Sequence, residues 1–177
     1  QRSVGPQVMN QLVQEAVLTT VASVPADRPL RILEIGAGTG GTTAHLLPQL
    51  ATLPNQLTYL FTDISPRFTS AAAERFQDFE FVDYALLDIE RSPQLQNFSA
   101  DYDLVIAANV LHATANLRHT LENVSNLLAP GGQLILLEGT APVGWVDLIF
   151  GMTPGWWAFS DIALRADHPL LSVDQWQ

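Results

Sequence analysis

Two residues in the second half of the chain, His112 and Glu138, could together carry out proton transfer. An unperturbed imidazole has a pKa of about 6.5, so its neutral form can accept a proton at neutral pH. A carboxylate bonded to that imidazole fixes its tautomer and stabilises the imidazolium that forms when the proton moves. The structural alternative is that His112 caps a helix starting near Thr114 and that Glu138 is a loop residue.

A second group of candidate residues lies in the glycine cluster RILEIGAGTGGTT, residues 31–43. Gly36, Gly38 and Gly41 satisfy the spacing G-x-G-x-x-G, and Asp63 follows about 20 residues later. Glycines allow the backbone to approach a ligand closely, and a helix N-terminus presents free N–H groups. Asp63 can accept hydrogen bonds from ribose hydroxyls. The pattern indicates a cofactor that contains adenosine, whereas a phosphate-binding P-loop is excluded because the chain has no lysine.

Strand and helix patterns alternate along the chain and must position these residues. The expected strands cover residues 30–35, 57–62, 81–86, 102–108 and 133–137, with a turn at 130–132 before the last strand. This alternation is typical of an α/β protein with a doubly wound, mostly parallel sheet and right-handed crossovers. The fourth and fifth strands would be neighbours in that sheet. His112 and Glu138, which follow these strands, could then reach the same crevice.

The expected helices differ in how clearly their ends are marked. One helix begins at the glycine turn and runs through Leu47, and another has Ser65 as N-cap, Pro66 as first residue and an end near Phe76. A third is marked by Leu117, Leu121, Val124 and Leu128. The N-terminal helix carries an apolar stripe that we expect to pack on the core, formed by Val8, Met9, Leu12, Val13, Ala16, Val17 and Val21.

Beyond Glu138 the sequence is rich in aromatic residues, is broken by Gly and Pro, and has no clear period. Trp145, Phe150, Trp156 and Trp157 could form the wall of an acyl pocket or pack against a neighbouring domain. The sequence leaves both possibilities open.

Composition excludes several classes of chemistry. The 177 residues suit one domain, and the net charge is −10, from 18 acidic residues against 8 basic ones, all arginine. So acidic a chain repels phosphate backbones and anionic membranes, and we expect neither nucleic acid nor membrane as partner. The absence of lysine and cysteine excludes lysine Schiff bases, disulfides, thiolate metal sites and cysteine nucleophiles. We predict no metal site and a cytoplasmic location.

Five ordered motifs resemble those of class I S-adenosylmethionine-dependent methyltransferases, and more closely the C-methyltransferase domains of polyketide synthases. The motifs are LEIGAGTG, FTDIS, LLDIE, IAANVLHAT and LLAPGGQLILLEGT, and the later FGMTPGWW belongs to the same resemblance. The likeness runs from Arg31 to about Asp161. It implies a Rossmann-like methyltransferase core in one domain, 1–177. Its parts would be an N-terminal helix and linker at 1–29, a cofactor-binding core at 30–138 and an aromatic, substrate-side segment at 139–177.

The resemblance also assigns residues to S-adenosyl-L-methionine. Around the methionine part of the cofactor it places Glu34, Gly36, Ala37, Gly38 and Gly40. Asp63 would bind the ribose diol, with Ile64 against the adenine. Asp88 would take the adenine amino group and Ile89 one ring face, and Asn109 would lie under the cofactor. These positions follow strands, where open α/β sheets bind ligands, although an aspartate after a strand also serves as a turn residue or helix cap.

The function that the resemblance implies is C-methylation, with His112 as base and Glu138 as the residue that orients it. The acceptor would be the α-carbon of a β-ketoacyl thioester held on the phosphopantetheine of an acyl carrier protein, and neighbouring synthase domains would be partners. The alternatives are an O- or N-methyltransferase of small molecules, a non-catalytic pseudo-methyltransferase spacer and, from the glycine spacing alone, a nicotinamide oxidoreductase.

The ends of the chain suggest a fragment. It opens on Gln1 and stops at Gln177, before the reversed pair of strands with which methyltransferases of this class finish. We therefore expect a truncated core excised from a multidomain synthase.

Overall fold

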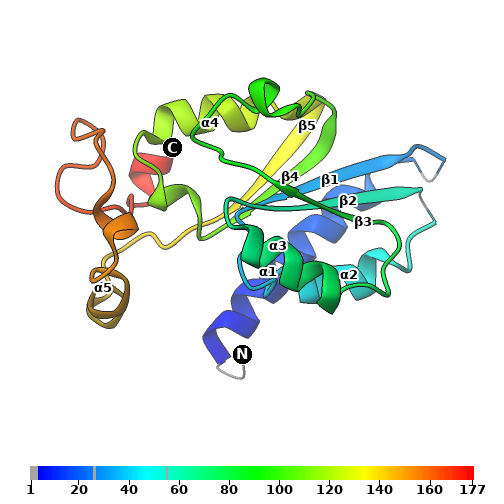
Figure 1. Ribbon diagram of the computed structural model, residues 1–177, viewed down its shortest axis with the longest axis horizontal. Coiled ribbons are helices and arrows are strands. Elements are labelled where there is room, and N and C mark those ends of the chain that lie inside the picture. Colours follow the sequence, from blue (N-terminus) through cyan, green and yellow to red (C-terminus); the bar gives the residue numbers. More distant parts are fainter. Residues whose placement is uncertain (1–3, 26, 55) are drawn as a thin grey trace.

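Five strands form a single sheet in the computed structural model, which describes residues 4–25, 27–54 and 56–177 (Figure 1). The strands are β1 (Leu30–Ile35), β2 (Leu57–Asp63), β3 (Val82–Leu86), β4 (Tyr102–Ala108) and β5 (Leu128–Leu137). Their order is β3-β2-β1-β4-β5, and all four pairings are parallel. The expected doubly wound α/β fold is confirmed, with a sheet that is entirely parallel over the described residues.

Helices cover both faces of the sheet (Figure 1). The α-helices are α1 (Val4–Ala22), α2 (Thr43–Leu50), α3 (Pro66–Arg75), α4 (Leu117–Ser125) and α5 (Gly144–Phe150), and the 3₁₀ helices are η1 (Pro93–Gln96), η2 (Leu111–Ala113), η3 (Pro154–Trp157) and η4 (Asp174–Trp176). Apolar side chains of α1, α2 and α3 pack on one face, and α4 packs on the other together with residues from the last part of the chain. The sheet thus lies between two separate apolar layers.

The expected apolar stripe of α1 is correct only in its second half. Val13 and Val17 are buried, as is Val21, whereas Val8, Met9 and Leu12 are exposed. In the first half the buried residue is polar: Asn10 accepts a hydrogen bond from the Thr42 hydroxyl. This end of the helix therefore contacts the chain near the glycine loop through hydrogen bonds instead of apolar packing.

The turn expected at residues 130–132 lies inside strand β5. Pairing with β4 shifts register there, since Tyr102 faces Leu128 but Leu104 faces Gln133. Gly131 has a positive φ of 81°, and a Cβ on Gly132 would lie 2.7 Å from the Tyr102 carbonyl oxygen. The extra residues bulge out while strand pairing continues on both sides, a position in a strand for which glycine is suited. The fifth strand is therefore longer than the sequence predicts.

Two helix ends also differ in detail from expectation. Helix α2 continues to Leu50 with Pro48 inside it, beyond the expected end at Leu47. Helix α3 starts at Pro66, as expected, but the Ser65 side chain makes no capping hydrogen bond. The end near Phe76 is confirmed, because that residue is the C-cap.

The order of the strands places a crevice beyond the carboxyl ends of the central strands. Strands β1 and β4 are adjacent in the middle, and the chain leaves them toward β2 on one side and β5 on the other. In open parallel sheets, ligands bind beyond the carboxyl ends of the two strands at which the order reverses. The glycine loop after β1 and the segment after β4 meet at this point.

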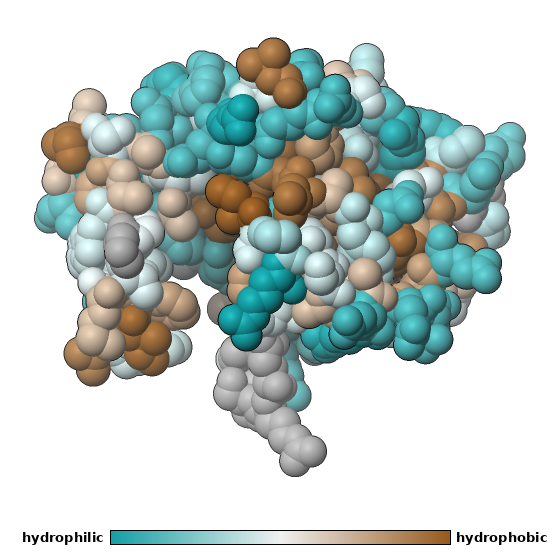
Figure 2. All heavy atoms as spheres, in the orientation of Figure 1, coloured by the Kyte–Doolittle hydropathy of each residue, from teal (hydrophilic) through white to brown (hydrophobic). Residues whose placement is uncertain are grey.

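The segment after β5 extends away from the sheet and carries exposed apolar side chains. Helix α5 lies apart from the sheet in Figure 1 and has no buried residue. Hydrophobic atoms are visible over this region at the lower left of Figure 2, where Leu148, Ile149 and Phe150 are exposed. Within the described residues, no helix combines the length and apolarity that a membrane crossing requires.

Candidate active site

The glycine loop after β1 has a backbone shape that requires glycine. Gly36, Gly38 and Gly40 all have positive φ, at 57°, 55° and 69°. A Cβ on Gly36 would lie 2.2 Å from Cγ2 of Val110, and one on Gly40 would lie 2.8 Å from the Phe76 ring. At Gly36 and Gly40 the loop can therefore pack against Val110, after β4, and Phe76, after α3, only without a side chain. Ala37, between the first two glycines, donates its N–H to the Thr62 carbonyl oxygen.

Asp63 joins the glycine loop to the end of β2. One of its carboxylate oxygens, Oδ2, accepts the Gly38 N–H at 2.9 Å, and Oδ1 accepts the Ser65 N–H at 2.8 Å. The side chain is almost fully buried. Because each carboxylate oxygen can accept a second hydrogen bond, Asp63 can still receive a ribose hydroxyl while it fixes the loop.

A hollow of about 210 Å³ lies beside Asp63. Its lining comes from the ends of β1, β2, β3 and β4: Ile35, Gly36, Asp63, Ile64, Leu87, Asp88, Ile89, Glu90, Val110, Ala113 and Thr114. Ile64 and Ile89 give it two apolar walls. Asp88 accepts the Glu90 N–H with Oδ1. Five of the predicted cofactor residues, from three different strand ends, are thus together around one hollow.

Five predicted cofactor residues do not line this hollow: Ala37, Gly38 and Gly40, which lie in the glycine loop, and Glu34 and Asn109. Asn109 is exposed just beyond β4, with a positive φ of 54° and its N–H bonded to the Leu137 carbonyl oxygen. Glu34 is buried in β1, where Oε2 accepts hydrogen bonds from the Thr43 hydroxyl at 2.5 Å and the Tyr59 hydroxyl at 2.6 Å. Burial raises the pKa of Glu34 to about 7, although the two hydrogen bonds oppose the shift. Neither residue is part of the lining.

His112 and Glu138 meet beside the hollow. His112 lies in η2, directly after β4, and Glu138 directly follows β5. The distance from Nδ1 of His112 to Oε2 of Glu138 is 2.5 Å, and the two side chains are 11% and 2% exposed. The other carboxylate oxygen, Oε1, accepts the N–H groups of Val110 at 3.0 Å and Leu111 at 2.7 Å. One carboxylate thus orients both the imidazole and the backbone that carries it.

The alternative role of His112 as a helix cap does not match the geometry. Helix α4 begins at Leu117, and its N-cap is Asn116, whose side chain accepts the His119 N–H. With Nδ1–H donated to Glu138, the lone pair on Nε2 of His112 is left to accept a proton.

An aromatic cluster lies against one side of the His112 side chain. The Trp156 ring lies edge-on to the imidazole with centroids 5.2 Å apart, and Phe150 stacks on Trp156 at 5.7 Å. Trp156 is buried, whereas Trp145 and Trp157 are exposed. The C-terminal segment therefore covers one side of the imidazole with apolar groups.

A model of the methyltransferase domain family matches residues 33–134. The chain belongs to this family. It is 41% identical over 170 residues to the non-reducing polyketide synthase mapC of Penicillium brevicompactum, a match that covers 94% of this chain and 7% of the synthase. The crystal structure of the CurJ carbon methyltransferase superposes with a TM-score of 0.95 and 52% identity, covering 99% of this chain and 46% of that one.

The structure of the trans-methyltransferase CalH was solved as a complex with SAH. It matches with a TM-score of 0.78 and 41% identity, over 94% of this chain and 46% of that chain. The chain is thus a C-methyltransferase domain of a polyketide synthase, and it has the fold of class I S-adenosylmethionine-dependent methyltransferases. The chain spans about half the length of these solved methyltransferases and a small part of the curated synthase.

Two polar residues of this C-methyltransferase domain were missed in the sequence. Glu90 lies in the rim of the hollow, where its carboxylate accepts the Ala115 N–H. Arg165 is buried and contacts the backbone that follows His112. Its only sequence signal is the i, i+4 spacing from Asp161, which is common on protein surfaces. Within the part of the chain that the structure describes, no cluster of three or more His, Asp or Glu residues could hold a metal ion.

Proposed function

We propose that this domain methylates the α-carbon of a β-ketoacyl thioester that an acyl carrier protein presents on its phosphopantetheine arm. The observation that carries the proposal is the His112–Glu138 pair, with Nδ1 and Oε2 2.5 Å apart at the carboxyl ends of two adjacent strands. Val110, Ala113 and Thr114, on either side of His112, line the hollow. A pair that could act as a base thus lies next to the hollow, which supports the proposal because C-methylation needs a base at this place.

The residues around the hollow fit an adenosine-containing cofactor. Gly38 leaves room beside the loop, since a Cβ there would meet only the Gly36 carbonyl oxygen at 3.9 Å, and Asp63 has acceptor capacity for the ribose hydroxyls. Asp88 would accept the adenine amino group, with Ile64 and Ile89 against the ring. S-adenosylmethionine held here would supply a methyl group on a positively charged sulfur: a carbon nucleophile would bond to the methyl carbon in line with the C–S bond, whose electrons would leave with the sulfur.

The chain's own contribution to the chemistry is proton removal from the acceptor. His112 accepts the α-proton at Nε2, and the electron pair of the broken C–H bond remains on the substrate as an enolate. Glu138 bonds to Nδ1–H throughout, which stabilises the imidazolium.

Other roles of the predicted residues belong to the same proposal. Glu34, Ala37, Gly40 and Asn109 would support the methionine end of the cofactor. Of these, Glu34 would act through the α2–β2 contacts that it makes here. The three parts at 1–29, 30–138 and 139–177, the carrier protein and neighbouring domains as partners, and the cytoplasmic location stay predictions.

The test is His112→Ala in the intact synthase, with His119→Ala as a matched control, because His119 is exposed on α4. We expect His112→Ala to lose methyl transfer by about 10²- to 10⁴-fold and to lose α-proton exchange on a β-ketoacyl thioester. Titration with S-adenosylhomocysteine should be unchanged. His119→Ala should retain all three properties. Full transfer by His112→Ala would refute the base assignment, and transfer without exchange would favour an oxygen or nitrogen acceptor.

The cofactor part of the proposal has a separate test. Asp63→Ala should weaken binding of S-adenosylhomocysteine about 10- to 100-fold, since a carboxylate hydrogen bond contributes about 1.5–3 kcal/mol. It also removes the acceptor of the Gly38 N–H. NADH serves as the control ligand and should not bind. Unchanged S-adenosylhomocysteine affinity would contradict the role of Asp63 at the ribose.

A further inference from the structure

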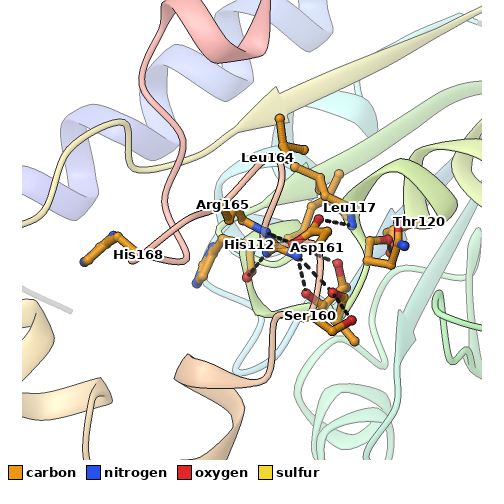
Figure 3. Close-up of polar contacts among 12 residues, drawn as sticks. His112, Leu117, Thr120, Ser160, Asp161, Leu164, Arg165 and His168 are labelled. Carbon is orange, nitrogen blue, oxygen red and sulfur yellow. Dashed lines mark hydrogen bonds and ion pairs between the residues drawn. The ribbon is translucent and has the colours of Figure 1, made fainter.

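Arg165 is a fully buried cation whose partners lie in the segment that carries His112. The residue is 1% exposed. Its Nη1 donates to the His112 carbonyl oxygen at 2.9 Å, and Nη2 donates to the carbonyl oxygens of Thr114 at 2.8 Å and Ala115 at 3.3 Å. Figure 3 shows the guanidinium directed at this stretch of backbone.

Asp161 holds the guanidinium in this position. Its Oδ1 accepts from Nε of Arg165 at 2.7 Å, and its Oδ2 accepts the Leu117 N–H at 2.9 Å (Figure 3). Burial raises the pKa of Asp161, but the hydrogen bonds from Arg165 and Leu117 outweigh burial, so the pKa lies below its usual value. Asp161 is therefore ionised at neutral pH and forms a charged pair with Arg165.

The short helix η2 is thus held from two opposite sides. At its start, the Glu138 carboxylate accepts the N–H groups of Val110 and Leu111. At its end, Arg165 donates to the carbonyl oxygens of His112, Thr114 and Ala115. The first anchor comes from the end of β5 and the second from the C-terminal segment, 53 residues after His112. Since η2 has only three residues, its own hydrogen bonds cannot fix its orientation.

We propose that Arg165 is a positioning residue for the base His112. By fixing three carbonyl groups, it keeps the imidazole in contact with Glu138 and Nε2 directed at the acceptor carbon. The inference rests on the proposed function, because it assumes that His112 removes the α-proton. Positions within a reacting geometry are sensitive, since misplacement by about 1 Å lowers rates by about 10²-fold.

The geometry of the contacts requires arginine. Three nitrogens of the planar guanidinium donate in different directions, to the Asp161 carboxylate and to carbonyl groups on two parts of the backbone. A lysine ammonium is a point charge and cannot match this fork. Lysine at this position would retain the pair with Asp161 and lose part of the contact with the backbone, whereas methionine would lose both.

The experiment compares Arg165→Lys, Arg165→Met and Asp161→Asn in the intact synthase, with Arg118→Met as control, since Arg118 is exposed on α4. For Arg165→Met we expect kcat of methyl transfer to fall about 100-fold, and α-proton exchange to fall in parallel. Arg165→Lys should recover part of the loss, and Asp161→Asn should show an intermediate loss. Affinity for S-adenosylhomocysteine should stay within about twofold in all of them, and Arg118→Met should behave as the unmodified protein.

Two outcomes would overturn the inference. Unchanged kcat and exchange per folded protein in Arg165→Met, with only a lower melting temperature, would make Arg165 a stability residue. Equal losses of kcat and of S-adenosylhomocysteine binding would mean that it supports the whole crevice. If Arg165→Met does not fold, Asp161→Asn decides, because it keeps the cation, removes the paired negative charge and leaves one acceptor oxygen for the two donors Nε of Arg165 and Leu117 N–H. Failure of the proposed function is distinct, because His112→Ala would then itself keep full activity.

Discussion

The two halves of the crevice are built in different ways. At the carboxyl ends of β1, β2 and β3 the site is formed largely by backbone: glycines with positive φ, and N–H groups bonded to Asp63. At the carboxyl ends of β4 and β5 it consists of side chains that are distant in sequence. Glu138 is 26 residues from His112, and Arg165 is 53 residues from it. In the proposed function, the first half would hold a ligand of fixed shape, whereas the second would orient one reactive nitrogen.

This difference predicts that substitutions separate binding from chemistry. A change in the glycine loop should affect cofactor affinity and leave proton removal intact. A change around His112 should do the opposite. The close approach of Gly36 to Val110 joins the two halves, because Val110 also donates its N–H to Glu138. The Glu90 carboxylate, which accepts the Ala115 N–H, is a second link.

The largest effect is expected for Glu138→Gln. An amide has one acceptor oxygen, and if this oxygen receives the N–H groups of Val110 and Leu111, the NH₂ group faces Nδ1 of His112. Nδ1 must then accept, so the proton moves to Nε2 and the imidazole can no longer take the α-proton. Methyl transfer should fall by about 10²- to 10⁴-fold, measured as the rate constant of a single turnover.

The control for this substitution is Glu122→Gln, on the exposed side of α4, which should leave transfer unchanged. S-adenosylhomocysteine affinity should be the same in both variants. If Glu138→Gln kept more than a tenth of the transfer rate, the carboxylate would not be setting the tautomer, and the contrast between the two halves would lose its chemical basis.

An intermediate effect is expected for Gly36→Ala. A Cβ there would lie 2.2 Å from Val110 and would sit on a backbone with φ of 57°, a conformation that costs roughly 1–2 kcal/mol for alanine. The free loop can relax to relieve this strain and must regain its shape on binding, so affinity for S-adenosylhomocysteine should fall about 5- to 30-fold in calorimetric titration, since 1.4 kcal/mol is a factor of ten. Gly144→Ala is the matched control, because a Cβ at Gly144 meets nothing within 4 Å.

The α-proton exchange of Gly36→Ala makes the comparison sharper. Exchange at the unmodified rate would show two independent halves. Loss of exchange that Val110→Ala restores in the double variant would show that the halves are coupled through this one contact. Unchanged cofactor affinity in the single variant would contradict the role of the glycine loop.

Sequence patterns predicted the backbone-built half far better than the other. The glycine loop and Asp63 lie in continuous local motifs, and the five strands were found because each is a short apolar run. The turn at 130–132 was wrong since glycines in a bulge and in a turn look alike in sequence. His112 and Glu138 were paired from strand order. Arg165 has only the common i, i+4 spacing from Asp161 as a local signal, because its other partners are backbone carbonyls 50 to 53 residues away. The side-chain environment of Glu34 likewise depends on Tyr59 in another strand.

The smallest effect is expected for the pH dependence of stability that comes from Glu34, which is buried in β1 just before the glycine loop. Its pKa of about 7 exceeds the usual 4.5, so the folded protein binds a proton there more tightly than the unfolded chain does. The stability that depends on this proton is present at low pH and is lost as pH rises toward 7 and above. The loss between pH 6 and 8 is about 1 kcal/mol, or roughly 2–4 °C in the melting temperature.

Glu34→Gln removes this ionisation, and the glutamine oxygen can still accept hydrogen bonds from Thr43 and Tyr59. The melting temperature of the variant minus that of the unmodified domain should therefore increase as pH rises from 6 to 8. Methyl transfer at pH 6 should be unaltered. A difference in melting temperature that is constant over this range would show that Glu34 does not titrate there. If transfer at pH 6 also fell, Glu34 would act on the cofactor directly, and side-chain contacts would be part of both halves of the crevice.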